Sequence, residues 1–164
     1  MTTEPVIKVG MADLQVTSGA GSLRTTGLGS CVGITLYDPL AHIAGMAHVM
    51  LPTSVIVREG PLNSAKYADT AIPQMIEQMI CLGAQVRRMQ AKMAGGAQMF
   101  AFSKPSETMR IGPRNVESCK EMLQKYTIPL IAEDTGGNFG RTIELIPDTG
   151  MLIVRSVQYG VKEI

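Results

Sequence analysis

The 164-residue sequence contains no tryptophan and few other aromatic residues, with four tyrosines and three phenylalanines. A folded core must therefore be filled by aliphatic and thioether side chains, and 12 methionines are available for this purpose. The formal net charge is only +1 at pH 7. This balance argues against a dedicated nucleic-acid-binding protein, which normally carries a strongly basic surface, and against a polybasic membrane anchor.

Long hydrophobic runs are also missing. The longest one, from Ile43 to Leu51, contains His48 and is much shorter than the roughly 20 residues that span a membrane. The N-terminal residues show no basic region followed by an apolar block. We therefore expect neither a secretory signal nor insertion into a membrane.

Cysteine is scarce as well. The three cysteines, at positions 31, 81 and 119, form no CxxC pair and no even set for disulfides, so we expect reduced thiols and a cytoplasmic protein. The cysteines and the two histidines are too scattered for a zinc site, and the stretch Gly27-Leu28-Gly29-Ser30 does not match a dinucleotide-binding fingerprint. The sequence predicts no metal and no cofactor.

What is present predicts a folded domain. The composition, 45% hydrophobic and 18% charged, favours a packed core in one domain over residues 1–164. Apolar runs separated by turn residues predict strands over residues 5–17, 31–37, 42–50, 85–93, 128–133, 139–146 and 151–157, and helices over residues 66–83 and 113–126. This order indicates an α+β fold, a layered mixed β-sandwich or sheet with helices packed on it.

Cys31 differs from the other two cysteines in its sequence context. It follows a flexible glycine-rich stretch whose backbone N–H groups, at Gly29 and Ser30, can surround the sulfur. A nucleophile needs such donors, because they stabilise the oxyanion that forms beside it. Cys81 and Cys119 lie on or beside helical apolar stripes and are expected to be packed. From the residues alone, a packed cysteine at a strand start is the alternative for Cys31.

A hairpin is expected to bring Cys31 to a histidine. Two apolar runs flank residues 38–41, where Asp-Pro is typical of a type I turn. With this loop, the register places Cys31 opposite His48, and cross-strand partners have Cβ atoms about 4.5–5.5 Å apart on one face. A slip of one residue would place the two side chains on opposite faces. His42, at the turn, is expected to face solvent.

An imidazole that serves as a base needs a third group to hold its tautomer and orientation. The candidates are the hydroxyls of Thr25, Thr26 and Ser30 and the carboxylates of Asp38, Glu133 and Asp134. Residue chemistry leaves the choice among them open. The alternative for His48 is a hydrogen-bonded core histidine without a catalytic role.

Six short sequence motifs occur along the chain in a defined order. They are Thr25-x-Gly27-Leu28-Gly29-Ser30-Cys31, Ala47-His48-Val49-Met50-Leu51-Pro52, Lys66-Tyr67-Ala68-Asp69-Thr70-Ala71, Ala91-Lys92-Met93-Ala94-Gly95-Gly96-Ala97, Ile111-Gly112-Pro113-Arg114-Asn115 and Ala132-Glu133-Asp134-Thr135-Gly136-Gly137-Asn138. In this order they resemble the CheD family of chemoreceptor glutamine deamidases. The resemblance covers nearly the whole chain.

This resemblance implies a cysteine hydrolase, similar in fold and active site to the deamidating domain of cytotoxic-necrotizing-factor toxins. It implies that Cys31, His48 and Thr25 are the catalytic residues. The implied substrates are glutamine side chains in the cytoplasmic domains of chemotaxis receptors, which become glutamate with release of ammonia through a thioester on the cysteine. One departure from the family pattern is Thr26, where an apolar residue is usual.

The resemblance also implies a partner. Family members bind CheC, a phosphatase of the phosphorylated response regulator, and CheC inhibits the deamidase. Two alternatives use the same residues. One is a non-catalytic regulatory module that binds CheC or a receptor through the same cleft, and the other is a cysteine protease that cuts peptide bonds.

Overall fold

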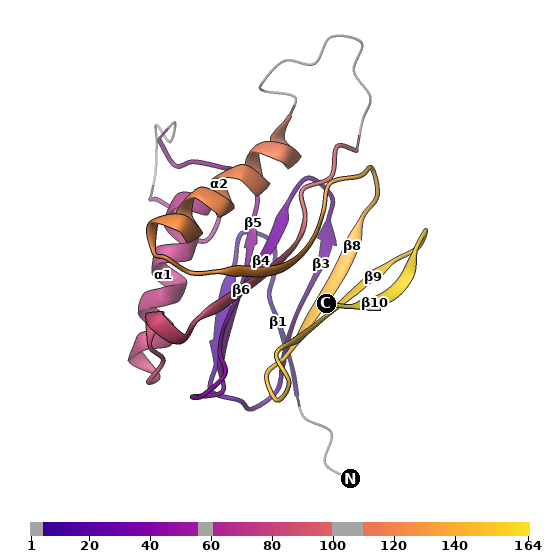
Figure 1. Cartoon of the computed structure of the whole chain (residues 1–164). Helices are drawn as coiled ribbons and strands as arrows, with labels where there is room; N and C mark the ends of the chain where they lie inside the picture. The colour runs from indigo at the N-terminus through magenta and orange to yellow at the C-terminus, as the bar shows by residue number, and fades with distance from the viewer. Residues whose placement is uncertain (1–4, 56–60, 100–109) are drawn as a thin grey trace.

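The computed structural model describes residues 5–55, 61–99 and 110–164. Within these ranges the strands form two five-stranded sheets (Figure 1). The first sheet has the strand order β1 (Val6–Lys8), β3 (Ser22–Leu28), β8 (Arg141–Ile146), β9 (Met151–Ser156) and β10 (Gly160–Glu163). The second sheet has the order β2 (Leu14–Thr17), β5 (Ile43–Val49), β4 (Val32–Asp38), β6 (Gln90–Gly95) and β7 (Leu130–Thr135). Each sheet is mixed, because β1 pairs parallel with β3 and β6 pairs parallel with β7.

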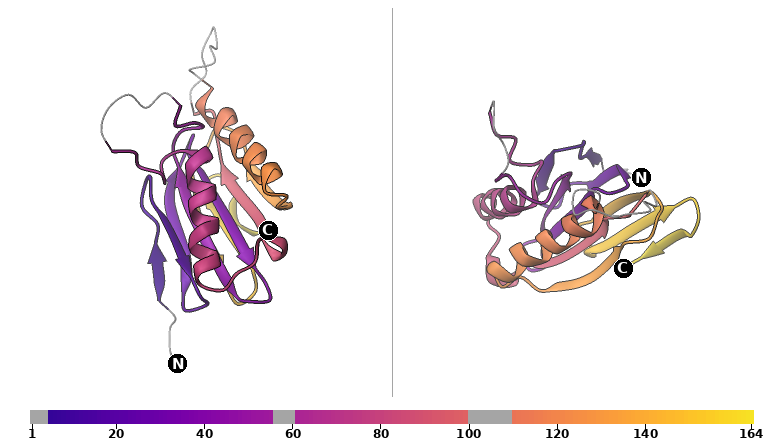
Figure 2. Two further views of the ribbon diagram at one scale, coloured as in Figure 1. Left: turned by 90° about the vertical axis from the view of Figure 1, so that its left-hand side faces the viewer. Right: turned by 90° about the horizontal axis from the view of Figure 1, so that it is seen from above.

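The elements are arranged in three layers (Figure 2). Helices α1 (Ala68–Cys81) and α2 (Ile111–Lys125) pack on one face of the second sheet, and the first sheet covers its other face. One hydrophobic cluster lies between the helices and the second sheet, and another lies between the two sheets. The expected α+β fold with helices on layered, mixed sheets is confirmed. In the part of the chain that the structure describes, neither helix has the length and apolar character needed to cross a membrane.

Strands β4 and β5 lie inside the second sheet and are buried on both faces. Ile34 of β4 packs in the cluster under the helices, whereas Tyr37 packs in the cluster between the sheets. Ala47 and Met46 of β5 divide in the same way. Successive residues of a strand point to opposite faces, so a strand covered on both sides is apolar throughout. This explains why the sequence shows two continuous apolar runs.

The two expected helices form with slightly different ends. The first, expected over residues 66–83, ends before Gly83, which adopts a φ of 112°. The N–H of Ala84 donates to the C=O of Met79 over 3.0 Å, a C-terminal cap that favours glycine at this place. The second, expected over residues 113–126, begins two residues earlier as α2.

Parts of the strand prediction are wrong. Residues 5–17, expected as one strand region, contain two strands that belong to different sheets, β1 and β2. No strand is expected at residues 22–28, yet they form β3. Polar residues conceal this strand, because Thr25 is buried through hydrogen bonds instead of through an apolar side chain. Strand β10 is concealed too, since all four of its residues are exposed. The strand expected over residues 85–93 begins only at β6, after a short 3₁₀ helix at Val86–Arg88.

The expected hairpin is formed by β4 and β5, but its register differs from the predicted one by two residues. The turn lies one residue later, so that Asp38 pairs with Ile43, and Gly33 instead of Cys31 lies opposite His48. A shift of two residues preserves the face, because side chains alternate with a period of two. Cys31 therefore still points toward the space between the sheets, where it joins the hydrophobic cluster.

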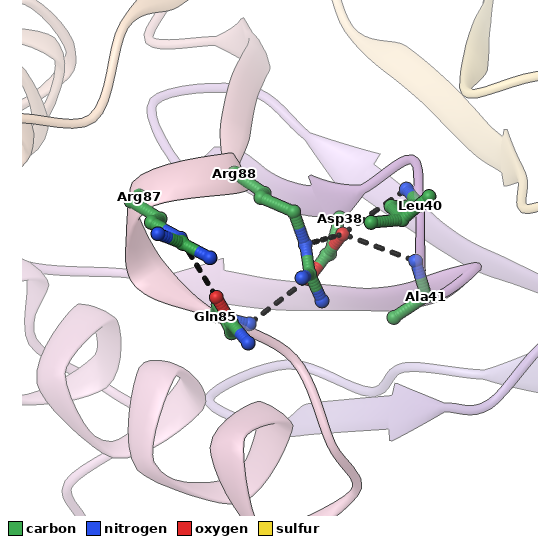
Figure 3. A network of polar contacts seen from close by, with 6 residues as sticks. All are labelled: Asp38, Leu40, Ala41, Gln85, Arg87 and Arg88. Atoms are coloured by element: carbon green, nitrogen blue, oxygen red, sulfur yellow. Dashed lines mark hydrogen bonds and ion pairs between the residues drawn. The ribbon is translucent and has the colours of Figure 1, made fainter.

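A buried ion pair closes this hairpin at its turn (Figure 3). The side chain of Asp38 is fully buried and accepts hydrogen bonds from Nε of Arg88 at 2.9 and 3.0 Å, with Nη2 a further 2.9 Å contact. The backbone N–H groups of Leu40 and Ala41 donate to the same carboxylate over 3.1 Å, and that of Gln85 donates over 2.9 Å. Asp38 thereby fastens the β4–β5 turn to the segment that follows α1.

These contacts determine how Asp38 titrates. Burial alone would raise the pKa of Asp38, but the hydrogen bonds from Arg88, Gln85 and Ala41, together with the charge of Arg88, lower it from 3.8 to about 2. Because the unfolded chain has the higher pKa, the ionised carboxylate stabilises the fold fully above about pH 5. This stabilisation is lost as the pH falls toward the folded-state pKa.

We predict that Asp38→Asn lowers the free energy of unfolding at neutral pH by about 2 kcal/mol, because a neutral amide cannot pair with Arg88. In urea unfolding at a series of pH values, the deficit should be constant above about pH 5 and shrink below it. The control is Asp148→Asn at an exposed position, which should change the free energy by less than about 0.5 kcal/mol. A deficit that is independent of pH would contradict this explanation.

Candidate active site

Three consecutive strands, β3, β4 and β5, carry the predicted site residues toward the space between the two sheets. Thr25 lies in β3, Cys31 directly precedes β4, and His48 is the next-to-last residue of β5. All three are buried, with exposed fractions of 1%, 8% and 0%. Gly33 lies opposite His48, and a Cβ there would approach Cδ1 of Ile143 to 2.4 Å. Side chains of the first sheet, Ile143 and Leu28, therefore fill the space beside Gly33.

The shortest polar contact of the site joins Thr25 to His48. Oγ1 of Thr25 lies 2.7 Å from Nδ1 of His48 and donates its proton to the C=O of Val9 over 2.8 Å. A carbonyl oxygen can only accept, and a hydroxyl has a single proton to donate. Oγ1 must therefore accept at His48, so Nδ1 carries the proton of the neutral ring. Through Thr25, the C=O of Val9 determines the tautomer of His48.

This tautomer leaves a lone pair on Nε2 of His48. Nε2 is buried and has no hydrogen-bond partner among the described residues, so the imidazole and the Cys31 thiol are not bonded to each other. Buried polar atoms without partners are rare in folded proteins and call for an explanation. Oδ1 of Asn115 is likewise buried without a partner among the described residues. The lone pair of Nε2 has the capacity to accept a proton from a thiol or from a molecule that enters the site.

Burial shifts both titratable groups toward their neutral forms. It raises the pKa of the Cys31 thiol, although the N–H of Cys31 itself acts in the opposite direction. It lowers the pKa of His48. These environments favour a neutral thiol beside a neutral imidazole at rest, and they oppose a thiolate–imidazolium pair.

Hydrogen bonds fix the loop that carries the sulfur. The C=O of Gly29 accepts from the N–H of Ala97 over 2.8 Å, and the C=O of Cys31 accepts from the N–H of Gly96 over 2.9 Å. The N–H of Cys31 lies close enough to its own sulfur to influence the thiol, which is where an oxyanion would need a donor. The N–H of Gly29, one of the two predicted donors, is bonded to the C=O of Gly27 over 3.2 Å.

Asn115 of α2 completes the support of this loop, and the sequence analysis missed it. Its side chain is buried, and Nδ2 donates to the C=O groups of Ser30 and Met50, each over 3.0 Å. Asn115 thereby ties the residue before Cys31 to a residue just beyond His48. The signal in the sequence is an amide on the apolar stripe of a helix, where a polar group is tolerated only if it is hydrogen-bonded.

Glycines allow these segments to approach one another. A Cβ at Gly95, which has a φ of 111°, would lie 2.2 Å from the C=O oxygen of Cys31. A Cβ at Gly112 would lie 2.2 Å from the C=O oxygen of Ala97. Because both obstacles are backbone atoms, residue 95 must be glycine for the end of β6 to pack against the cysteine loop, and residue 112 must be glycine for the start of α2 to pack against the segment after β6.

The other candidate residues lie elsewhere. Of the six candidates for the third group, only Thr25 contacts His48 within the described ranges. Thr26 is exposed, and the C=O of Ser30 accepts from Asn115. The three carboxylates form ion pairs instead. Asp38 pairs with Arg88 at the far end of the hairpin, Glu133 pairs with Lys120, and Asp134 pairs with Arg141 and Lys162. His42 is exposed in the turn, as expected. Cys119 is fully buried, which raises its pKa to about 12, whereas Cys81, expected to be packed, is exposed.

A cysteine, a histidine of defined tautomer and an orienting hydroxyl are the groups that cysteine hydrolases combine. Comparison with known proteins assigns the family. The family described as "CheD chemotactic sensory transduction" matches residues 50–156. A protein of Halalkalibacterium halodurans named "Chemoreceptor glutamine deamidase CheD" is 52% identical over 159 residues, which cover 97% of this chain and 98% of the relative. A protein of the same name from Bacillus subtilis is 49% identical over 164 residues, with 99% of each chain covered.

The chain therefore belongs to the CheD family. The segment that matches the family description begins after Thr25, Cys31 and His48. The alignments with the two relatives, in contrast, extend over nearly the whole chain.

We predict that Thr25→Val destabilises the protein by about 1–3 kcal/mol, because the C=O of Val9 and Nδ1 of His48 lose their partner. The ¹⁵N chemical shifts of the imidazole should then show a mixture of the two neutral tautomers instead of the Nδ1–H form. Thr26→Val is the matched control, because Thr26 is exposed and has the same shape. It should leave both the tautomer and the stability as they are. An unchanged Nδ1–H tautomer in Thr25→Val would contradict the role assigned to this hydroxyl.

Proposed function

We propose that this chain is a protein-glutamine deamidase that converts glutamine side chains of chemotaxis receptors to glutamate and releases ammonia. The names of two relatives that match nearly the whole chain support this substrate. The observation that carries the chemistry is the 2.7 Å contact between Oγ1 of Thr25 and Nδ1 of His48. It keeps Nε2 available as a base in the space that His48 shares with Cys31.

In the proposed reaction, Nε2 of His48 takes the thiol proton of Cys31 while the sulfur bonds to the carboxamide carbon of the glutamine. The N–H groups of Ser30 and Cys31 stabilise the oxyanion, since that of Gly29 is already bonded to Gly27. His48 then returns the proton to the nitrogen, so that ammonia leaves and a thioester remains. Water, deprotonated by His48, attacks the thioester, which yields glutamate and restores the thiol.

Burial supports a side-chain amide over a peptide bond as the substrate. Cys31 is 8% exposed and His48 is not exposed at all. A peptide carbonyl carries main chain on both sides and would have to bring it into this confined space. A glutamine side chain is long and unbranched, so it can deliver its carboxamide alone. We therefore favour deamidation over proteolysis, which the same groups perform on exposed sites.

The proposal extends to the rest of the chain. We propose that residues 1–164 form one CheD-like domain, similar in fold to the cytotoxic-necrotizing-factor-like cysteine hydrolases, and that it acts in the cytoplasm. The layered sheets support the fold, and three free thiols among the described residues are consistent with a reducing compartment. CheC is proposed as a partner from the family resemblance. A non-catalytic module that binds CheC or a receptor is the alternative, and the next experiment separates the two.

We predict that Cys31→Ala slows ammonia release from a chemoreceptor cytoplasmic fragment by about a thousandfold or more, because alanine cannot form the thioester. Intact-mass analysis should show that the wild type adds about 1 Da per glutamine, since OH replaces NH₂, and does not cut the fragment. Cys81→Ala, which removes the exposed thiol, is the control and should keep the wild-type rate. If folded Cys31→Ala deamidates as fast as the wild type, the proposal fails.

We also predict a one-sided dependence of kcat/KM on pH. Burial lowers the pKa of His48, so activity should be lost only as the pH falls below the usual range of histidine and should stay level up to about pH 8. A resting thiolate–imidazolium pair would instead lose activity on the alkaline side, as His48 gives up its proton. Circular dichroism at each pH distinguishes titration from unfolding. A decline in activity between about pH 7 and 8, with the fold intact, would contradict the neutral resting pair.

A further inference from the structure

An open groove adjoins the candidate site on the side of the first sheet. It encloses about 670 Å³ and is bordered by β3, by the start of β8, by the end of β9 and by the turn between β9 and β10. Gly27, in the irregular end of β3, lines the groove. Met99 lines it as well and packs against Gly29, two residues before Cys31. Through Met99, one end of the groove therefore lies near the loop that carries the thiol.

The charge of the groove is one-sided. Three arginines line it, Arg24, Arg141 and Arg155, and no acidic residue is among its described lining residues. Arg141 is already engaged, because Nε lies 3.2 Å from the carboxylate of Asp134 and the guanidinium lies 4.0 Å from the centre of the Phe139 ring. Arg141 is therefore held by contacts within the fold, which leaves Arg24 and Arg155 to consider.

Arg24 and Arg155 are exposed, and within the described ranges neither guanidinium has a hydrogen bond or an ion pair. Arg24 faces away from the core because its neighbour Thr25 faces into it. Glu144 is the register partner of Arg24, but it forms no ion pair with Arg24 and does not line the groove. Two positive charges are therefore left for a molecule that enters the groove.

Apolar surface lies beside these charges. Met99, Phe139 and Val157 line the groove. Met99 is 44% exposed, and Val157, in the turn between β9 and β10, is as exposed as a residue in an extended chain. A groove that combines free arginines with exposed apolar side chains has the composition of a protein-recognition surface, in which arginine and methionine are enriched. An inorganic anion would leave the apolar part uncovered.

We propose that this groove binds the acidic segment of the substrate protein that flanks the target glutamine. Arg24 and Arg155 pair with its carboxylates, and the apolar side chains cover its aliphatic parts, while the glutamine reaches Cys31. The inference rests on the proposed deamidase function, and it adds the feature that selects a glutamine in an acidic surrounding from other glutamines.

The test compares two receptor fragments, one with acidic residues beside each target glutamine and one with serine in their place. The variants are Arg155→Gln and Arg24→Gln, and Arg87→Gln is the matched control, because Arg87 is exposed and lies near the far end of the hairpin (Figure 3). The ratio of kcat/KM for the acidic fragment to that for the serine fragment should fall about threefold to fivefold in each variant, through KM. Arg87→Gln should keep the wild-type ratio.

Binding is measured separately, so that the groove can be tested without turnover. The probe is a fluorescently labelled peptide rich in glutamate around one glutamine, and its anisotropy is followed on Cys31→Ala protein. Adding Arg155→Gln should weaken binding by a similar factor and reduce the dependence of binding on salt. Adding Arg87→Gln should do neither.

The outcomes separate the two proposals. If the wild type releases ammonia but the ratio is unchanged in Arg155→Gln and Arg24→Gln, the groove assignment is overturned and the deamidase proposal stands. If neither fragment loses ammonia, the deamidase proposal is overturned, and peptide binding that is unaffected by Arg155→Gln overturns the groove as well. Tighter binding of a single-stranded oligonucleotide than of the peptide, lost in the same variants, would overturn the choice of an acidic protein.

Discussion

One proton, on the hydroxyl of Thr25, determines which ring nitrogen of the neutral His48 carries a proton. It is committed to the C=O of Val9, and this commitment makes the oxygen an acceptor toward His48. An aspartate in the same place would also orient the ring, but it would bring a negative charge that stabilises an imidazolium. A neutral hydroxyl orients the ring and adds no charge that would favour the imidazolium. The same preference for a neutral form follows from the burial of Cys31, which raises the pKa of its thiol.

The rigidity of this arrangement comes from backbone contacts more than from side-chain packing. The sulfur-bearing loop is held through its carbonyl groups by β6 and by Asn115. The close approach depends on glycine at residues 95 and 112, where a Cβ would meet backbone oxygens. A catalytic geometry must be kept within fractions of an ångström, and bonds to main chain on several sides achieve this better than flexible side chains do.

Much of this could be anticipated from residue patterns, and the failures have physical causes. The turn residues at 38–41 predicted the hairpin, and the period of two kept Cys31 and His48 on one face although the register was two residues away. The physics of the residues did not distinguish Thr25 from five other groups, because the choice depends on β3, a strand without an apolar pattern. Only the resemblance between motifs singled out Thr25. The pairing of β3 with β8 joins segments more than 100 residues apart, and β9 follows as the next strand of the sheet, so the neighbourhood of Arg24 and Arg155 could not be read from spacing.

The two sides of strand β3 present different groups, one to the surface of the protein and one to the space between the sheets. Arg24 and Thr26 face outward, and Thr25 between them faces His48. A substitution at Arg24 or Thr26 can therefore change the outer surface of the strand without removing the hydroxyl that contacts His48. The exposed side and the buried side of this seven-residue strand can thus change independently of each other.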